Sequence, residues 1–101
     1  MSASEILARR YIAVIAERHP DPFKGNKQMD HAHLTWMCEV IMNHHDLWPA
    51  DKVGRWIGFV QGVLAAQGLI DINVERDFSR PLFHREYARM GIDAPDTIGR
   101  G

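Results

Sequence analysis

The chain has 101 residues, of which 46% are hydrophobic and 25% are charged, so its composition is that of one globular domain and not of a disordered segment. Its 12 Lys and Arg nearly balance its 13 Asp and Glu, and a formal charge of −1 argues against nucleic acid as a partner. No apolar run is long enough to span a bilayer, no signal-peptide pattern is present, and the single Cys38 excludes an internal disulfide. A protein of the cytoplasm is expected.

The first helix is expected to run from a Ser2 cap to Arg18. Ser2 followed by Glu5 matches a capping box, in which the two side chains satisfy free amides at a helix start. Pro20 and Pro22 end this helix because proline lacks an amide and disfavours a helical residue before it. Its apolar positions at helical spacing are Ile6, Leu7, Tyr11, Val14 and Ile15.

The second and third helices are bounded by similar signals. Asp30 is the predicted N-cap of the second helix, and Pro49 lies in the first turn of the third, where a missing amide costs nothing. The third helix runs to about Gln67, and Gly68 suits the position that follows a helix end. The second helix carries the apolar stripe Leu34, Met37, Cys38, Ile41, Met42 and His45.

The fourth helix begins after a predicted Asp71 cap and closes at Gly91. Val74, Phe78 and Leu82 form its apolar face, and Pro81 either kinks the helix or breaks it. The sequence therefore predicts an all-α, compact four-helix domain over residues 1–91, with its last helix kinked or broken at Pro81, followed by a frayed tail over residues 92–101.

The third helix carries an unusual stripe of glycines. Gly54, Gly58 and Gly62 lie on one helix face, and each costs roughly 1 kcal/mol relative to alanine. A close approach must offset that cost, since small residues allow two backbones to come near each other. The approaching element is another helix of this chain, a second copy in a homodimer, or a partner or ligand; the sequence leaves all three open.

No metal, cofactor or catalytic site is expected. His31, Cys38 and His45 repeat at seven-residue steps, which separates successive members by about 10.5 Å, too far for one ion to join them. Cys38 lies on the apolar stripe, so a reactive thiolate is not expected there. The sequence also lacks nucleophile-elbow, phosphate-loop and dinucleotide-binding motifs, which argues against an enzyme.

The fourth helix carries a cationic ridge, formed by Arg76, Arg80 and His84 at steps of four. Arginine can bind a carboxylate or a phosphate through two parallel hydrogen bonds, so the ridge is a candidate contact for an acidic partner. Two further candidates are Arg55, beside the glycine stripe, and Trp48, an aromatic anchor at the start of the third helix. A solvated face without a partner is the alternative for the ridge.

Three stretches resemble a family of small bacteriophage and prophage proteins. They are WPADKVGRWIGFVQGVL from Trp48 to Leu64, ERDFSRPLFHREY from Glu75 to Tyr87, and HLTWMC from His33 to Cys38. The resemblance covers roughly two-thirds of the chain, from about Asp30 to Tyr87. That family has no established activity and no catalytic residues, so the resemblance implies a setting, a phage gene product in a bacterial cytoplasm.

These observations together favour a non-enzymatic accessory protein that binds and modulates a host or phage protein, such as a component of host defence. Two alternatives stay open. One is an oligomeric binder that sequesters a nucleotide-like anion between subunits, with the cationic ridge meeting phosphate. The other is a component of the virion or of its assembly.

Overall fold

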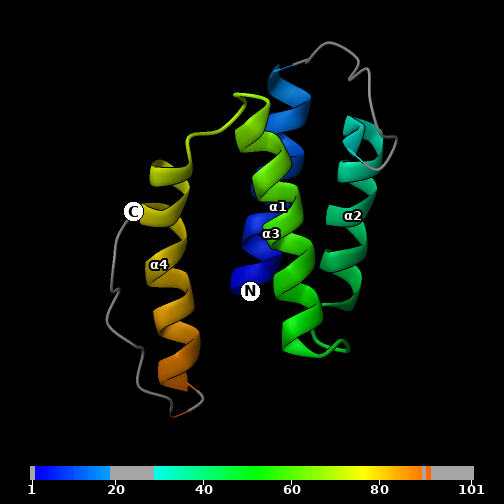
Figure 1. The fold of residues 1–101 in the computed structure, drawn as a ribbon. Helices are drawn as coiled ribbons and strands as arrows, with labels where there is room; N and C mark the ends of the chain where they lie inside the picture. The colour runs from blue at the N-terminus through cyan, green and yellow to red at the C-terminus, as the bar shows by residue number, and fades with distance from the viewer. Residues whose placement is uncertain (1, 19–28, 90, 92–101) are drawn as a thin grey trace.

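Four helices make up the fold of this protein, for which a computed structural model describes residues 2–18, 29–89 and 91 (Figure 1). The helices are α1 (Ala3–Arg18), α2 (His31–His44), α3 (Ala50–Ala66) and α4 (Ile72–Arg89). No strand occurs within the described residues. The predicted all-α, four-helix architecture is confirmed. The proline-containing segment 19–28 and the predicted tail 92–101 lie outside the described residues.

Helix α1 is the centre of the bundle. It packs against α2 and α3, which also pack against each other, and α4 lies along α1 on the side away from α2 (Figure 1). The apolar faces of α1, α2 and α3 meet in one core, because residues three and four apart share a helix face. The core consists of Leu7, Ala8, Tyr11 and Ile15 from α1, Leu34, Met37, Cys38 and Ile41 from α2, and Val53, Ile57, Val60, Val63 and Leu64 from α3.

The cap at the start of α1 agrees with the predicted capping box at Ser2 and differs from it at Glu5. Ser2 Oγ accepts the backbone N–H of Glu5 at 3.1 Å, as expected. The Glu5 carboxylate instead contacts Arg9 at 3.2 Å and His45 Nε2 at 3.3 Å, while His45 Nδ1 lies 3.1 Å from Ser2 Oγ. The capping side chains therefore join the start of α1 to His45, the residue that caps the end of α2.

The predicted bounds of the later helices agree with the structure to within a residue or two. Asp71 Oδ1 accepts the N–H groups of Asn73 and Val74, and Gly68 and Gly91 adopt the positive φ that suits a helix end. Asp30 occupies the N-cap position of α2, although its side chain makes no capping hydrogen bond.

Helix α4 runs without a break from Ile72 to Arg89, with Pro81 inside it. The predicted alternative of two helices separated at Pro81 is therefore wrong, and a kink stays a prediction. The apolar face expected for this helix reaches the core in part: Leu82 is half-buried and packs against it, whereas Val74 and Phe78 are exposed. The residue of α4 that is buried is Glu75, because α4 is held on α1 through a charged contact.

Candidate functional site

The most distinctive surface of the molecule is a run of aromatic rings across α2 and α3, which we call the aromatic surface. The rings of His33 and Trp36 are 5.3 Å apart, and those of Trp36 and Trp56 are 5.9 Å apart. Trp56 contacts Trp48 edge to face at 4.9 Å, and Trp48 stacks on His44 at 5.4 Å. These spacings fall in the range preferred by interacting aromatic rings. All three tryptophans of the chain thus lie in one contiguous surface.

Helix geometry explains how two local patterns make this surface. His33, Trp36 and His44 lie on one side of α2, and Trp56 and Phe59 are three residues apart on α3. Packing α2 beside α3 brings the two sets together. The rings cover the edge of the core without being enclosed, since Trp36 is 50% exposed and Phe59 is 40% exposed. Leu47, beside Trp48 in the turn after α2, is 75% exposed and extends the apolar area.

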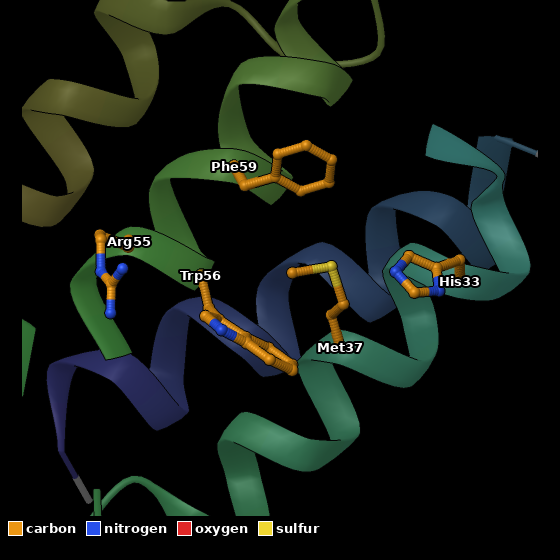
Figure 2. Close-up of a pocket in the computed structure, with 5 residues that line it drawn as sticks. All are labelled: His33, Met37, Arg55, Trp56 and Phe59. Carbon is orange, nitrogen blue, oxygen red and sulfur yellow. The ribbon is translucent and has the colours of Figure 1, made fainter. Parts of the chain in front are cut away.

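A pocket of about 270 Å³ opens within the aromatic surface. Figure 2 shows His33 and Met37 of α2 and Trp56 and Phe59 of α3 lying between the two helices, whereas Arg55, the fifth lining residue, lies across α3 from them. The thioether of Met37 and the two aromatic rings make its wall mainly apolar, and thioethers pack readily against irregular shapes. The pocket can therefore take an apolar side chain or a small apolar group.

Two cations, Lys52 and Arg55, lie at the α3 side of the aromatic surface. The ammonium of Lys52 lies 3.9 Å above the ring of Trp48, a cation–π contact. Arg55 lines the pocket, and its guanidinium lies 3.9 Å from the carboxylate of Asp51, with both side chains more than 70% exposed. An exposed pair at that distance contributes little to stability. Arg55 is therefore available to another carboxylate.

The structure brings two of the predicted contact residues together and leaves the rest apart. Trp48 and Arg55 both belong to the aromatic surface or its pocket. Arg76, Arg80 and His84 lie on α4, on the other side of α1 and α3 from α2 (Figure 1). Arg76 and His84 are exposed and Arg80 is half-buried. The cationic ridge is consequently a second, separate surface.

The glycine stripe is open. Gly54, Gly58 and Gly62 are exposed, and a Cβ added at any of them would meet no atom within 4 Å. The expectation that another helix of this chain packs closely there is wrong within the described residues, because α4 docks on α1 and leaves this face of α3 uncovered. A homodimer contact and contact with another partner stay predictions. At one end of the stripe, Gly54 borders a groove of about 530 Å³ that Phe83 and Tyr87 of α4 also line.

The remaining candidate residues are engaged in the fold. Cys38 is fully buried, and burial raises the pKa of its thiol to about 12, with the charge of Glu39 adding to the effect. His31 Nε2 lies 2.6 Å from Gln67 Oε1, which joins the start of α2 to the end of α3. No group of three or more His, Cys, Asp or Glu side chains in the described part of the chain is placed to hold a metal ion.

Sequence reasoning missed most of the aromatic surface. The pattern of the third helix places Trp56 on a broad apolar face opposite the glycines, and it gives Trp36 and His33 of the second helix no role of their own. That apolar face consists of Val53, Trp56, Ile57, Val60, Val63 and Leu64. The available signal was the position of Trp36 and His33 beside, and not within, the buried stripe of Leu34, Met37 and Cys38. That signal predicts exposure, but it does not reveal which rings meet across two helices.

The fold and the aromatic surface define the class of this protein as a small all-α domain with an exposed aromatic face. In comparisons with known proteins, no family model, no curated protein and no solved structure matches the chain. None of the four described helices is both long enough and apolar enough to cross a bilayer.

Proposed function

We propose that this protein acts by binding another protein, and that the aromatic surface is its principal contact. The observation that carries the proposal is the exposure of Trp36 and Phe59 at the edge of a stacked tryptophan cluster. A contiguous exposed apolar patch on a protein surface marks a candidate interaction site. The pocket that Phe59 lines together with Trp56 supports binding over a purely structural role.

The composition of the surface suits a protein partner. Tryptophan and arginine are the residues that most often dominate binding energy at protein interfaces, and both occur here as Trp36, Trp56 and Arg55. The rings are already held by contacts with one another, so little side-chain freedom is lost when a partner binds. A rigid aromatic area with one pocket is thus prepared for a stable contact.

The sequence resemblance supplies the setting of the proposal. In a bacterial cytoplasm the partner is a host or phage protein, and a component of host defence is one such protein. The protein works stoichiometrically, by occupying a surface of that partner, and its function needs no catalytic group or cofactor.

Affinity capture from bacterial lysate tests this proposal, with captured proteins identified by mass spectrometry. The bait is the tagged full chain, compared with the double variant Trp36→Ser and Phe59→Ser, whose exposed positions permit folding. We expect one stoichiometric protein that the double variant fails to retain. The matched control is Arg76→Glu with Arg80→Glu on α4, which keeps the partner if the aromatic surface is the contact.

Two results would overturn the proposal. Loss of capture by the α4 variant alone, with both variants folded by circular dichroism, assigns the contact to the cationic ridge. A specific nucleotide that raises the melting temperature of the pure protein favours the oligomeric anion binder, because a ligand that binds the native state stabilises it.

A further inference from the structure

We propose that the partner segment that occupies the aromatic surface is an acidic amphipathic helix. This inference rests on the proposed function, since it names the chemistry of the partner at the same surface. Three features carry it: the length of the strip, the apolar pocket within it, and the cations on its α3 side.

The shape of the surface suits a helix. From His33 to His44 the rings follow α2 for eleven residues, which corresponds to about 16 Å or three helical turns. The strip lies where α2 and α3 pack against each other, so the occupant follows two neighbouring helices. An amphipathic helix that lays its apolar face into such a surface presents anchors three, four and seven residues apart.

The pocket fixes the position of one anchor. Its volume of about 270 Å³ and its wall of Met37, Trp56 and Phe59 accept one apolar side chain of the partner. The exposed ring of Trp36, one contact away from Trp56, then covers a second apolar side chain along the strip. A partner helix therefore needs at least two apolar residues on one face.

The cations beside the aromatic surface favour a negatively charged partner helix. Lys52 contacts this surface and Arg55 lines its pocket, and the two cations lie three residues apart on α3. Arg55 is paired with Asp51 at 3.9 Å, and this exposed pair is readily exchanged for a carboxylate of the partner. A partner with glutamate or aspartate on the side that faces α3 thus gains two favourable interactions, and a basic partner meets repulsion.

Single-stranded nucleic acid is the competing class, because bases stack on aromatic side chains next to cations. The balance of charge argues against it. A backbone of phosphates requires a groove of several cations, whereas this surface offers Lys52 and Arg55 in a chain of formal charge −1. The two cations match a few carboxylates on one helix better than a continuous polyanion.

Selection from a random peptide library displayed on phage tests the inference with the full-length protein as the target. We expect enriched peptides with apolar residues at helical spacing and a net negative charge. A labelled synthetic peptide of the consensus sequence is then titrated by fluorescence anisotropy. Its affinity should fall about tenfold or more in Lys52→Glu with Arg55→Glu and be unchanged in the α4 control Arg76→Glu with Arg80→Glu.

A charge-swapped peptide gives the decisive comparison. Replacing its acidic residues by lysine should abolish binding to the native protein and restore binding to the Lys52→Glu, Arg55→Glu variant. Enriched peptides that lack an acidic bias, or that bind the reversed variant equally well, overturn the inference. The proposed function still stands in that case if the Trp36→Ser, Phe59→Ser variant loses them.

The other outcomes are equally informative. Peptides that bind the Lys52→Glu, Arg55→Glu variant and the Trp36→Ser, Phe59→Ser variant as tightly as the native protein overturn the inference and count against the aromatic surface itself. A selection that enriches no peptide has the same two consequences. Displacement of the peptide by single-stranded oligouridylate, with tighter binding of the oligonucleotide than of the peptide, assigns the surface to nucleic acid and also overturns it.

Discussion

The guanidinium of Arg10 on α1 donates two parallel hydrogen bonds of 2.9 Å each to the carboxylate of Glu75 on α4. The Glu75 side chain is only 3% exposed, so the pair is mostly removed from water on the α4 side. The ring of Phe78 lies 3.9 Å from the same guanidinium and covers it. One arginine therefore holds α4 to the bundle by two different interactions.

This contact continues into the core through Tyr11, which is fully buried beside Arg10. Gln61 of α3 donates a hydrogen bond of 2.8 Å to the Tyr11 hydroxyl. Burial, followed by the negative charge of Glu75, raises the pKa of Tyr11, and the hydrogen bonds from Arg10 to Glu75 raise the pKa of the Arg10 guanidinium. Three helices are thus tied together by one polar cluster.

Replacing Arg10 by alanine should destabilise the protein by about 2 to 3 kcal/mol, because the buried carboxylate of Glu75 is left without its partner. The free energy of unfolding in urea measures this. Arg9→Ala is the matched control, since Arg9 makes an exposed pair with Glu5 and should cost less than about 1 kcal/mol.

Hydrogen exchange locates the effect of Arg10→Ala. The substitution should speed up the exchange of the α4 amides more than that of the α2 amides, because the cluster anchors α4 and includes no residue of α2. Equal stability of the Arg10→Ala and Arg9→Ala variants would contradict the assigned role of the Arg10–Glu75 pair.

Gly58→Ala should stabilise the protein by about 0.5 to 1 kcal/mol, since alanine is the better helix former and nothing lies within 4 Å of the added methyl group. Gly68→Ala is the opposing control, because Gly68 has a φ of +75° that a Cβ disfavours. Thermal unfolding of both variants, with sedimentation velocity, gives the comparison. If the native protein sediments as a dimer, and Gly58→Ala both lowers the melting temperature and sediments as a monomer, the glycine stripe is a homodimer contact.

Stability should fall as the pH rises from about 9 to about 12, because the folded state holds the Cys38 proton that the unfolded chain releases from its ordinary pKa of 9.0. Denaturant midpoints across that range, compared with those of Cys38→Ala, measure the contribution of the thiol. The variant starts less stable because of the cavity it creates, and its stability should decline less steeply. Tyr11 acts in the same direction in both proteins, so the difference in slope reports Cys38.

The buried thiol should also resist modification. A thiol reagent at neutral pH should react with Cys38 slowly in the folded protein and rapidly in denaturant. Rapid reaction in the absence of denaturant would contradict the position of Cys38 in the core.

The aromatic surface predicts a spectroscopic signature. Trp56 contacts both other tryptophans, so Trp56→Phe should remove most of the exciton coupling in the circular dichroism spectrum. Trp36→Phe breaks one contact of the series and should remove only part of it. The helical signal is the internal reference, since both substitutions conserve a large aromatic side chain. An exciton signal in Trp56→Phe as strong as that of the native protein would contradict the observed ring contacts.

The sequence by itself determined where the three core helices, α1, α2 and α3, begin and end and which face of each is buried. Ser2 and Asp71 accept hydrogen bonds from amides within three residues, and Gly68 adopts a positive φ at the end of α3, so these signals can be read locally. The stripe that contains Leu34, Cys38 and Ile41 follows from a period of 3.6 residues and needs no knowledge of neighbouring helices.

Only the tertiary structure decided what meets across helices. Val74 and Phe78 have the spacing of a core face, yet Glu75 is the residue of α4 that is buried, because Arg10 lies opposite it on α1. In the same way, Trp36 and Trp56 come together only when α2 and α3 pack side by side, and the glycines stay open because α4 docks elsewhere. Periodicity shows which residues share a helix face, whereas the rotation and placement of the neighbouring helices determine what that face contacts.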